Sequence, residues 1–304
     1  MEPPIEVPRG RPPWHTELVA DDLVSHRWED WTWDETVFKG AAAYYRQGRK
    51  PYAPALSAVL AEHLGLDDHG RLLDVGCGPG TVALQFAHLF ESVVGVDPDP
   101  GMVAEATRAA AEEHVATATW VQMRAEELPG SLGTFRVITF GQSFHWMNRP
   151  RVAVAVRDML EPKGAVVQVD LWHMCPPGEE PRGGPFPAVP EAAIDELRRR
   201  WLGPHRRAGQ GFRDTSPDRE DEVFQSAGFA PEQIVVVPDD RVLVRSADDV
   251  VAWVLSTSST APHLFGERLG DFVRDLRDLL SEASPAGLFS VHLSDNRLRI
   301  RKPL

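Results

Sequence analysis

The stretch 71–80, RLLDVGCGPG, decides the fold of this 304-residue chain. A short apolar run ends in an acid, Asp74, and glycines follow at alternate positions: Gly76, Gly78 and Gly80. Apolar residues then recur at helical spacing in TVALQFAHLF, 81–90, so the pattern predicts a strand, a tight loop and a helix. Glycines let backbone amides approach a ligand closely, and the helix N-terminus behind them offers free N–H groups. The stretch therefore indicates a ligand-binding loop.

The spacing of the glycines limits the classes of ligand that the loop could bind. It is G-x-G-x-G, whereas the dinucleotide fingerprint is G-x-G-x-x-G. Asp74 suits a cationic ligand, and it would repel a pyrophosphate. A dehydrogenase would need the third glycine one residue later. An ordinary tight turn is the alternative interpretation of the loop taken alone.

A second apolar strand, SVVGVD at 92–97, ends in Asp97, which stands 23 residues after Asp74. An acid about 20 residues beyond a glycine loop lies at the end of the next strand in nucleotide-binding α/β units, where it accepts hydrogen bonds from ribose hydroxyls. Pro98 breaks the strand, and Met102 begins the following helix. Met102 suits contact with an adenine face, and packing of the helix on the sheet is the alternative.

Two further segments follow the same order of strand and loop. The first is TWVQMRAEELP at 119–129, which runs from a strand into Arg124, Ala125 and Glu126. The second is RVITFGQSFHWMN at 136–148, in which a strand leads into Gly141 and Gln142. Alternation of strands with helices up to AVVQVD, 165–170, predicts a parallel sheet covered on both faces.

Taken together, these four segments resemble the class I S-adenosylmethionine-dependent methyltransferases. Within them the closest resemblance is to the type-11 family, in the branch with a Phe-His-Trp run after the fourth strand, and it covers about residues 38–170. The segment AAAYYRQGRKPYAP, 41–54, resembles the element that this branch places before the glycine loop. Many members have an acid where this chain has Arg124, so Glu126 is the remaining candidate to accept from the adenine amino group, and a solvated helix-start charge is its alternative.

The resemblance implies a fold and a cofactor. The fold is an α/β, Rossmann-like, doubly wound, mostly parallel seven-stranded sheet with an antiparallel last strand, plus an N-terminal flap and an insertion after strand 5. The cofactor is S-adenosyl-L-methionine. The residues expected to bind it are Tyr45, Arg46, Tyr52, Asp74, Gly76, Cys77, Gly78, Gly80, Asp97, Pro98, Met102, Ala125, Glu126, Gly141, Gln142 and His145.

Candidates for chemistry and acceptor binding lie at the same predicted sheet edge. His145 is the general base by position, although a structural or cofactor-side role is the alternative because family members with different substrates share the run. His173 and His263 are the other candidate bases, each with a structural or surface role as the alternative. Four aromatic residues are expected to line an apolar acceptor pocket: Trp146, Trp172, Phe186 and Phe212.

The composition agrees with an enzyme that acts on small molecules. The net charge of −13 disfavours a nucleic-acid substrate, and two cysteines indicate neither a disulfide framework nor a zinc site. The proline-rich start is unlike a signal peptide, and no apolar stretch is long enough to span a membrane. We therefore expect a cytoplasmic monomer or homodimer with a small-molecule acceptor, no nucleic acid, no membrane partner and no metal.

The chain divides into four expected segments. Residues 1–40 form an N-terminal flap, since Trp14, Trp28, Trp31 and Trp33 are too many large aromatics for an isolated disordered tail. Packing of this flap against the domain is the alternative to a cover over the active site. Residues 41–170 form the cofactor-binding core, 171–217 a substrate-recognition insertion, and 218–304 the C-terminal part of the sheet.

Two functions fit these features. The first is methyl transfer to a small organic, possibly natural-product, acceptor by in-line displacement at the sulfonium carbon. The second is a protein of the same fold that binds the cofactor and has a non-methylating catalytic or regulatory role. Release of S-adenosylhomocysteine in the presence of an acceptor distinguishes them. The sequence leaves the acceptor and the methylated atom open.

Overall fold

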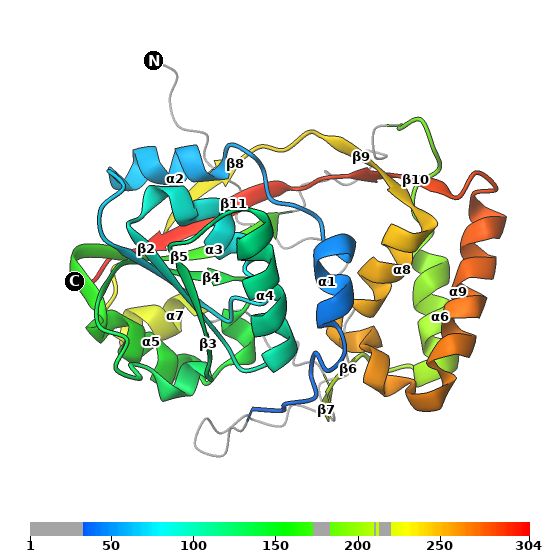
Figure 1. The fold of residues 1–304 in the computed structure, drawn as a ribbon, viewed down its shortest axis with the longest axis horizontal. Coiled ribbons are helices and arrows are strands. Elements are labelled where there is room, and N and C mark those ends of the chain that lie inside the picture. The colour runs from blue at the N-terminus through cyan, green and yellow to red at the C-terminus, as the bar shows by residue number, and fades with distance from the viewer. Residues whose placement is uncertain (1–32, 173–182, 210, 213–219) are drawn as a thin grey trace.

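A seven-stranded sheet forms the centre of the computed structural model, which describes residues 33–172, 183–209, 211–212 and 220–304 (Figure 1). The strand order is β3-β2-β1-β4-β5-β11-β8. The first five strands in this order pair in parallel, whereas β11 runs antiparallel to β5 and β8. The predicted α/β class, with a mostly parallel sheet and an antiparallel last strand, is confirmed. The strands of this sheet are β1 (Arg71–Val75), β2 (Ser92–Asp97), β3 (Ala118–Gln122), β4 (Phe135–Gly141), β5 (Leu160–Trp172), β8 (Gln233–Val237) and β11 (Asp295–Arg301).

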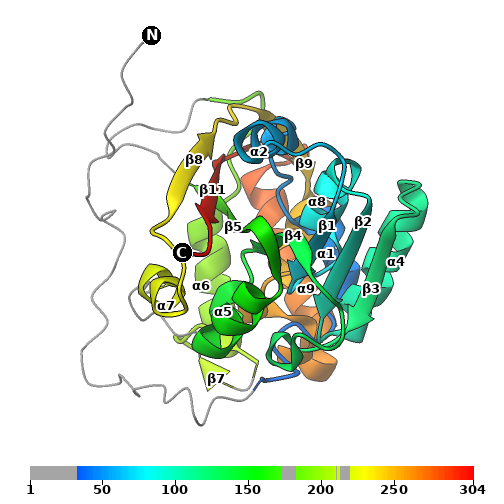
Figure 2. The same ribbon diagram turned by 90° about the vertical axis from the view of Figure 1, so that its left-hand side faces the viewer.

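Helices cover both faces of the sheet because its central strands are apolar on both sides. In β1, Leu72 packs into the core beneath one set of helices and the next residue, Leu73, packs into the core on the opposite face. Such continuous apolar runs are typical of buried parallel strands. Figures 1 and 2 show α2 on one side of the sheet and α5 and α7 on the other. The covering helices are α2 (Leu56–Leu64), α3 (Thr81–Phe86), α4 (Pro100–Glu112), α5 (Arg149–Asp158) and α7 (Glu220–Ser226).

A second group of helices lies beside the sheet and has a hydrophobic core of its own (Figure 1). Its helices are α1 (Ala42–Gly48), α6 (Glu191–Leu202), α8 (Ala247–Leu255) and α9 (Leu269–Ala283). An antiparallel pair, β9 (Val242–Ser246) and β10 (Leu288–His292), follows the β8–β11 pair toward this unit. A two-residue pair, β6 (Arg207–Ala208) and β7 (Gly211–Phe212), completes the strands described. Here the helical unit denotes α1, α6, α8 and α9.

The helical unit draws on segments far apart in the sequence. Ile194 from α6, Val254 from α8 and Phe272 from α9 are buried in one core. The expected insertion 171–217 and the expected C-terminal part 218–304 therefore share this core over their described residues. The division of the chain into four segments stays a prediction. Among the described residues, no helix combines the length and apolarity that crossing a membrane requires.

Candidate functional site

A hollow of about 650 Å³, open to solvent, lies at the carboxyl ends of β1, β2 and β4. In open α/β sheets, ligands bind at this edge. The lining joins residues from the loops after these strands with residues from the N-terminal segment. They are Trp33, Phe38, Tyr45, Gly76, Gly78, Asp97, Pro98, Asp99, Met102, Arg124, Ala125, Glu126, Gly141, Gln142, Ser143, Trp146 and Met147.

The three loop positions require glycine for different structural reasons. Gly78 has a φ of +54°, and a Cβ added to it would meet no atom within 4 Å. A Cβ at Gly76 would lie 2.6 Å from Ser143, and one at Gly80 would lie 2.6 Å from the Trp120 ring. Gly76 and Gly78 border the hollow, whereas Gly80 does not. Close packing therefore explains Gly76 and Gly80, and open space for a ligand is found at Gly78.

Asp97 is nearly buried, and backbone N–H groups hold both of its oxygens. Oδ2 accepts from Gly78 N at 2.9 Å, and Oδ1 accepts from Asp99 N at 3.0 Å. Burial raises the pKa of Asp97 to about 6, and these hydrogen bonds oppose the shift. Each carboxylate oxygen still has capacity for a further donor. The carboxylate is thus fixed in place with room to accept hydroxyl groups from the hollow.

Asp74 lies beneath the loop and outside the lining of the hollow. Its Oδ1 accepts from the Thr139 hydroxyl at 2.7 Å, while its buried Oδ2 has no hydrogen-bond partner among the described residues. Burial raises the pKa of Asp74 to about 7, and the Thr139 hydroxyl and the nearby Ala83 backbone N–H oppose the shift, although the latter does not reach hydrogen-bond geometry with Oδ2. A buried acceptor without a donor is costly, and a cation nearby would stabilise its charged form. Asp74 therefore fits a positively charged ligand, acting through charge from below the loop.

The ends of β2 and β3 form a second wall of the hollow. Met102 and Ala125 are buried and border it. Glu126 also borders it, and its Oε1 accepts from Asn148 N at 2.7 Å. This bond ties Glu126 to the segment after β4, which argues against a merely solvated charge.

The segment after β4 borders the hollow and contains one residue, Gln142, with a strained backbone conformation. Gln142 has a φ of +53°, a conformation that costs energy for a residue with a side chain. Burial raises the pKa of Tyr52 above its usual range, and the neighbouring Gln142 side chain opposes this shift. Ser143 donates to the Val75 carbonyl at 2.6 Å. Tyr52 does not border the hollow itself, so its contact runs through Gln142.

Aromatic side chains from the N-terminal segment close one side of the hollow. Phe38 packs edge-on against Trp146, with ring centroids 5.5 Å apart. Trp33 and Tyr45 border the same space, and the Arg49 guanidinium lies 4.7 Å from the centre of the Tyr45 ring. Trp33 and Phe38 were missed as individual site residues, although the cluster of tryptophans before residue 40 pointed to this segment. Asp99, Ser143 and Met147 were also missed, because each stands beside a predicted residue and carries no motif signal of its own, and Arg124 was missed because it stands where many family members have an acid.

Several expected cofactor residues lie outside the hollow. Arg46 is exposed and pairs with Glu112 at 2.6 Å and Glu113 at 3.3 Å, so its guanidinium is held by α4. Cys77 is buried beneath the loop, and burial raises the pKa of its thiol. These two residues support the site from outside, as do Tyr52, Asp74 and Gly80.

Neither of the two candidate catalytic histidines within the described residues, His145 and His263, borders the hollow. His145 is exposed, and its ring lies 4.8 Å from that of Trp146. His263 has Nδ1 3.2 Å from the Lys39 carbonyl, in a short 3₁₀ turn beside α8. His173 lies outside the described residues. The position of His145 after β4 is as expected, but the exposed ring does not point to a role as base.

Of the four aromatic residues expected to line the acceptor pocket, the structure places one at the hollow and one elsewhere. Trp146 borders the hollow. Phe186 lies instead beside β10, where its backbone N–H donates to Ser290 Oγ at 3.0 Å. The backbones of Trp172 and Phe212 end β5 and β7, and their side chains are outside the described part. In that described part, no cluster of three or more histidine, cysteine or acidic residues is placed to hold a metal ion.

The known proteins that this chain resembles are methyltransferases. Residues 72–164 match the family described as "Methyltransferase domain". The chain is 35% identical over 142 residues to the methyltransferase YcgJ of Bacillus subtilis, covering 46% of this chain and 55% of YcgJ. It is 28% identical over 126 residues to a methyltransferase of Schizosaccharomyces pombe, covering 40% of this chain and 47% of that one. The chain spans about half the length of the curated relatives it matches.

The crystal structure of YcgJ aligns with 81% of this chain and 97% of its own length, with a TM-score of 0.46 and 19% identity. The assignment rests on the family match and on the curated relatives. The Phe-His-Trp branch stays a prediction. Residues 72–164 form a methyltransferase domain of the class I, S-adenosylmethionine-dependent type, whose cofactor is S-adenosylmethionine.

Proposed function

We propose that the whole chain transfers a methyl group from S-adenosylmethionine to a small organic acceptor. One observation carries the proposal. A single hollow joins the fixed carboxylate of Asp97 and the open loop position at Gly78 to an aromatic wall of Trp33, Phe38 and Trp146. One part has the groups that a nucleoside needs, and the other has the apolar surface that an organic acceptor needs.

The residues of the first part fit the cofactor. Asp97 is placed to accept from ribose hydroxyls, and Met102 and Ala125 offer an apolar surface for the adenine ring. The unpartnered oxygen of Asp74 favours a cationic ligand above it. When bound, S-adenosylmethionine supplies a methyl group made electrophilic by the positive sulfur. The chain's own contribution is to orient the acceptor and exclude water, because positioning in near-attack geometry accounts for much of such a rate enhancement.

The acceptor proposed is a small molecule with an aromatic or apolar body. The hollow combines aromatic side chains with a few polar groups, as small-ligand sites do. Among the described lining residues, Asp97, Asp99 and Glu126 are acidic and Arg124 is basic. This balance, with the net charge of −13, is unsuited to the phosphate backbone of a nucleic acid.

A direct assay tests the proposal. The protein is incubated with S-adenosylmethionine and a panel of phenols, catechols, indoles and aromatic carboxylates, and S-adenosylhomocysteine release is measured. We expect acceptor-dependent release, with Trp146→Ala raising KM for the acceptor more than it weakens cofactor binding. Phe186→Ala is the matched control, because Phe186 lies beside β10 and outside this hollow. Binding of the cofactor without release by any acceptor of the panel would contradict this proposal and favour a non-methylating role.

A further inference from the structure

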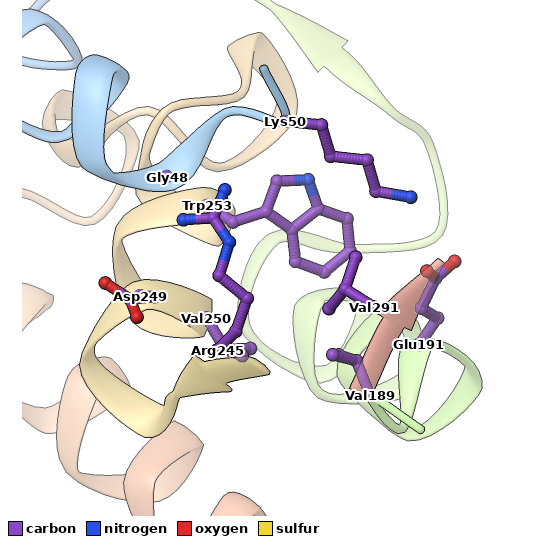
Figure 3. Close-up of a pocket in the computed structure, with 9 residues that line it drawn as sticks. All are labelled: Gly48, Lys50, Val189, Glu191, Arg245, Asp249, Val250, Trp253 and Val291. Carbon is purple, nitrogen blue, oxygen red and sulfur yellow. The ribbon is translucent and has the colours of Figure 1, made fainter. Parts of the chain in front are cut away.

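A second hollow, of about 340 Å³, lies between the helical unit and the β9–β10 pair (Figure 3). It shares no lining residue with the cofactor hollow. Helix α1 separates the two: Tyr45 borders the first, and Gly48 and the following Lys50 border the second. The second hollow is therefore distinct from the cofactor hollow.

The body of this hollow is apolar. Val189, Val250, Trp253 and Val291 line it, and Figure 3 shows the Trp253 indole beside Val291. Gly48 allows α1 to pack directly on α8, since a Cβ there would lie 2.4 Å from the Ala252 backbone. Close backbone contact makes this wall rigid. An apolar pocket with a rigid wall suits a branched or aromatic side chain.

Two opposite charges border the hollow without forming an ion pair. Lys50 Nζ makes one long hydrogen bond, 3.3 Å to the His292 carbonyl, and the ammonium has three donors. Glu191, the first residue of α6, has no side-chain hydrogen bond or ion pair within the part of the chain that the structure describes. Figure 3 shows the Lys50 ammonium and the Glu191 carboxylate on the same side of Trp253. The two charges attract each other, and within the described residues each can still take a ligand group as a partner.

The other charged residues of the lining are already engaged. Arg245 donates to the backbone carbonyls of Gln47 and Arg49. Asp249 accepts from the Gln47 side chain at 3.0 Å and from Ser246. These contacts fix the C-terminal end of α1 to β9 and α8. Lys50 and Glu191 are the charges left to recognise a ligand.

We propose that this second hollow binds a small zwitterion with an apolar side chain, of the chemical class of a branched-chain or aromatic α-amino acid. Its carboxylate pairs with Lys50, its ammonium pairs with Glu191, and its side chain packs on Trp253 and the valines. A simple carboxylate would meet the Glu191 charge, and a simple amine would meet Lys50. A zwitterion satisfies both groups.

Calorimetry on the full chain tests the pairing with defined probes. L-leucine and L-phenylalanine are compared with N-acetyl-L-leucine, which lacks the ammonium, and 3-methylbutylamine, which lacks the carboxylate. We expect binding of at least one amino acid at millimolar concentration, and binding of each single-charge analogue weaker by about tenfold or more, the value of one charge-assisted hydrogen bond. Equal binding of N-acetyl-L-leucine would overturn the zwitterion, and no binding of either amino acid would overturn the site.

Variants locate the binding. Lys50→Met and Glu191→Gln each remove one charge and keep the side-chain length, and each is expected to weaken binding about tenfold. Lys302→Met and Glu62→Gln are the matched controls, because both side chains are exposed and remote from this hollow. Thermal denaturation checks that all four variants fold. Amino-acid binding that survives both Lys50→Met and Glu191→Gln unchanged would place the ligand elsewhere and overturn the proposal.

Discussion

The backbone N–H of Gly78 donates a hydrogen bond to Oδ2 of Asp97 over 2.9 Å. With the bonds from the N–H groups of Gly76 and Cys77 to the Val96 carbonyl, this contact ties the glycine loop to the end of β2. The loop and the acid are therefore one preorganised unit, and their proposed roles can be tested separately.

Asp97→Ala is expected to weaken S-adenosylmethionine binding by about 1–3 kcal/mol, because charge-assisted hydrogen bonds to a buried carboxylate are lost. Titration calorimetry measures the affinity. Asp97→Asn keeps the shape and one acceptor, so its loss should be smaller than that of Asp97→Ala. Unchanged affinity in a folded Asp97→Ala protein would mean that the ribose is not held there.

Gly78→Val should abolish cofactor binding in a chain that still folds, because the branched side chain would occupy the open space of the loop. A positive φ also costs an L-residue about 1–2 kcal/mol of stability. Gly65→Val separates the two effects: Gly65 has a φ of +61°, and its added Cβ would also meet nothing within 4 Å, but it ends α2 away from the hollow. We expect both variants to lose similar stability and only Gly78→Val to lose binding. Tight binding by folded Gly78→Val would refute this role of the loop.

The buried acids predict how pH acts on the free protein and on its cofactor affinity. The pKa of Asp74 is about 7 and that of Asp97 about 6, both raised by burial. A raised folded-state pKa means that the fold favours the neutral acid, so this contribution to stability is present at low pH and is lost as pH rises from about 4 to the folded pKa. A cationic ligand favours the charged acids. Its affinity should therefore rise as the pH rises through the two pKa values, from about 6 to about 7.

Asp74→Asn isolates this effect, since the amide is neutral at every pH. Compared with the original chain, the variant should gain thermal stability above the pKa of about 7 and show a smaller gain at acidic pH. Its affinity for S-adenosylmethionine should be lower at alkaline pH, and its affinity should depend less on pH than that of the original chain, because only Asp97, with a pKa of about 6, still titrates. Denaturation scans and calorimetry across the pH range measure both. A stability difference that stays constant with pH would show that Asp74 titrates normally.

Cofactor binding is expected to order the aromatic wall. Trp33, Phe38 and Tyr45 border the hollow, so a lid predicts that backbone hydrogen exchange slows in 33–52 when S-adenosylhomocysteine binds. None of the described residues of 183–209 borders this hollow, and α6 packs in the helical unit, so we expect little change in α6. Protection confined to 72–146 would leave the N-terminal segment as packing only.

Arg301→Leu should destabilise the chain by about 1–3 kcal/mol, because the buried Gln168 side chain loses its donor and Glu232 loses one of its two cationic partners. Arg301 is fully buried, pairs with Asp221 and Glu232, and donates to Gln168 at 2.6 Å. Arg274→Leu is the matched control, since Arg274 forms an exposed pair with Asp271, and exposed pairs contribute little to stability. Equal urea midpoints for the two variants would contradict a structural role for the buried network.

The sequence alone determined the sheet, the cofactor loop and the acids around it. These are local signals: the strand ending at Val75, the positive-φ glycine at Gly78, and the acid at Asp97 depend on neighbours in the chain. Parallel strands place their carboxyl ends at one edge, so the motifs after β1, β2 and β4 had to converge. This is why most of the expected residues at those strand ends border one hollow.

Only the tertiary structure decided which side chains face that hollow and which support it. Arg46 carries a motif but pairs with α4, and His145 follows the right strand but is exposed, because orientation depends on packing partners distant in sequence. The helical unit could not be predicted from the sequence either, because its core joins Ile194, Val254 and Phe272, which are far apart in the chain. The same long-range packing brings Lys50 and Glu191 to one pocket, a juxtaposition that no local pattern encodes.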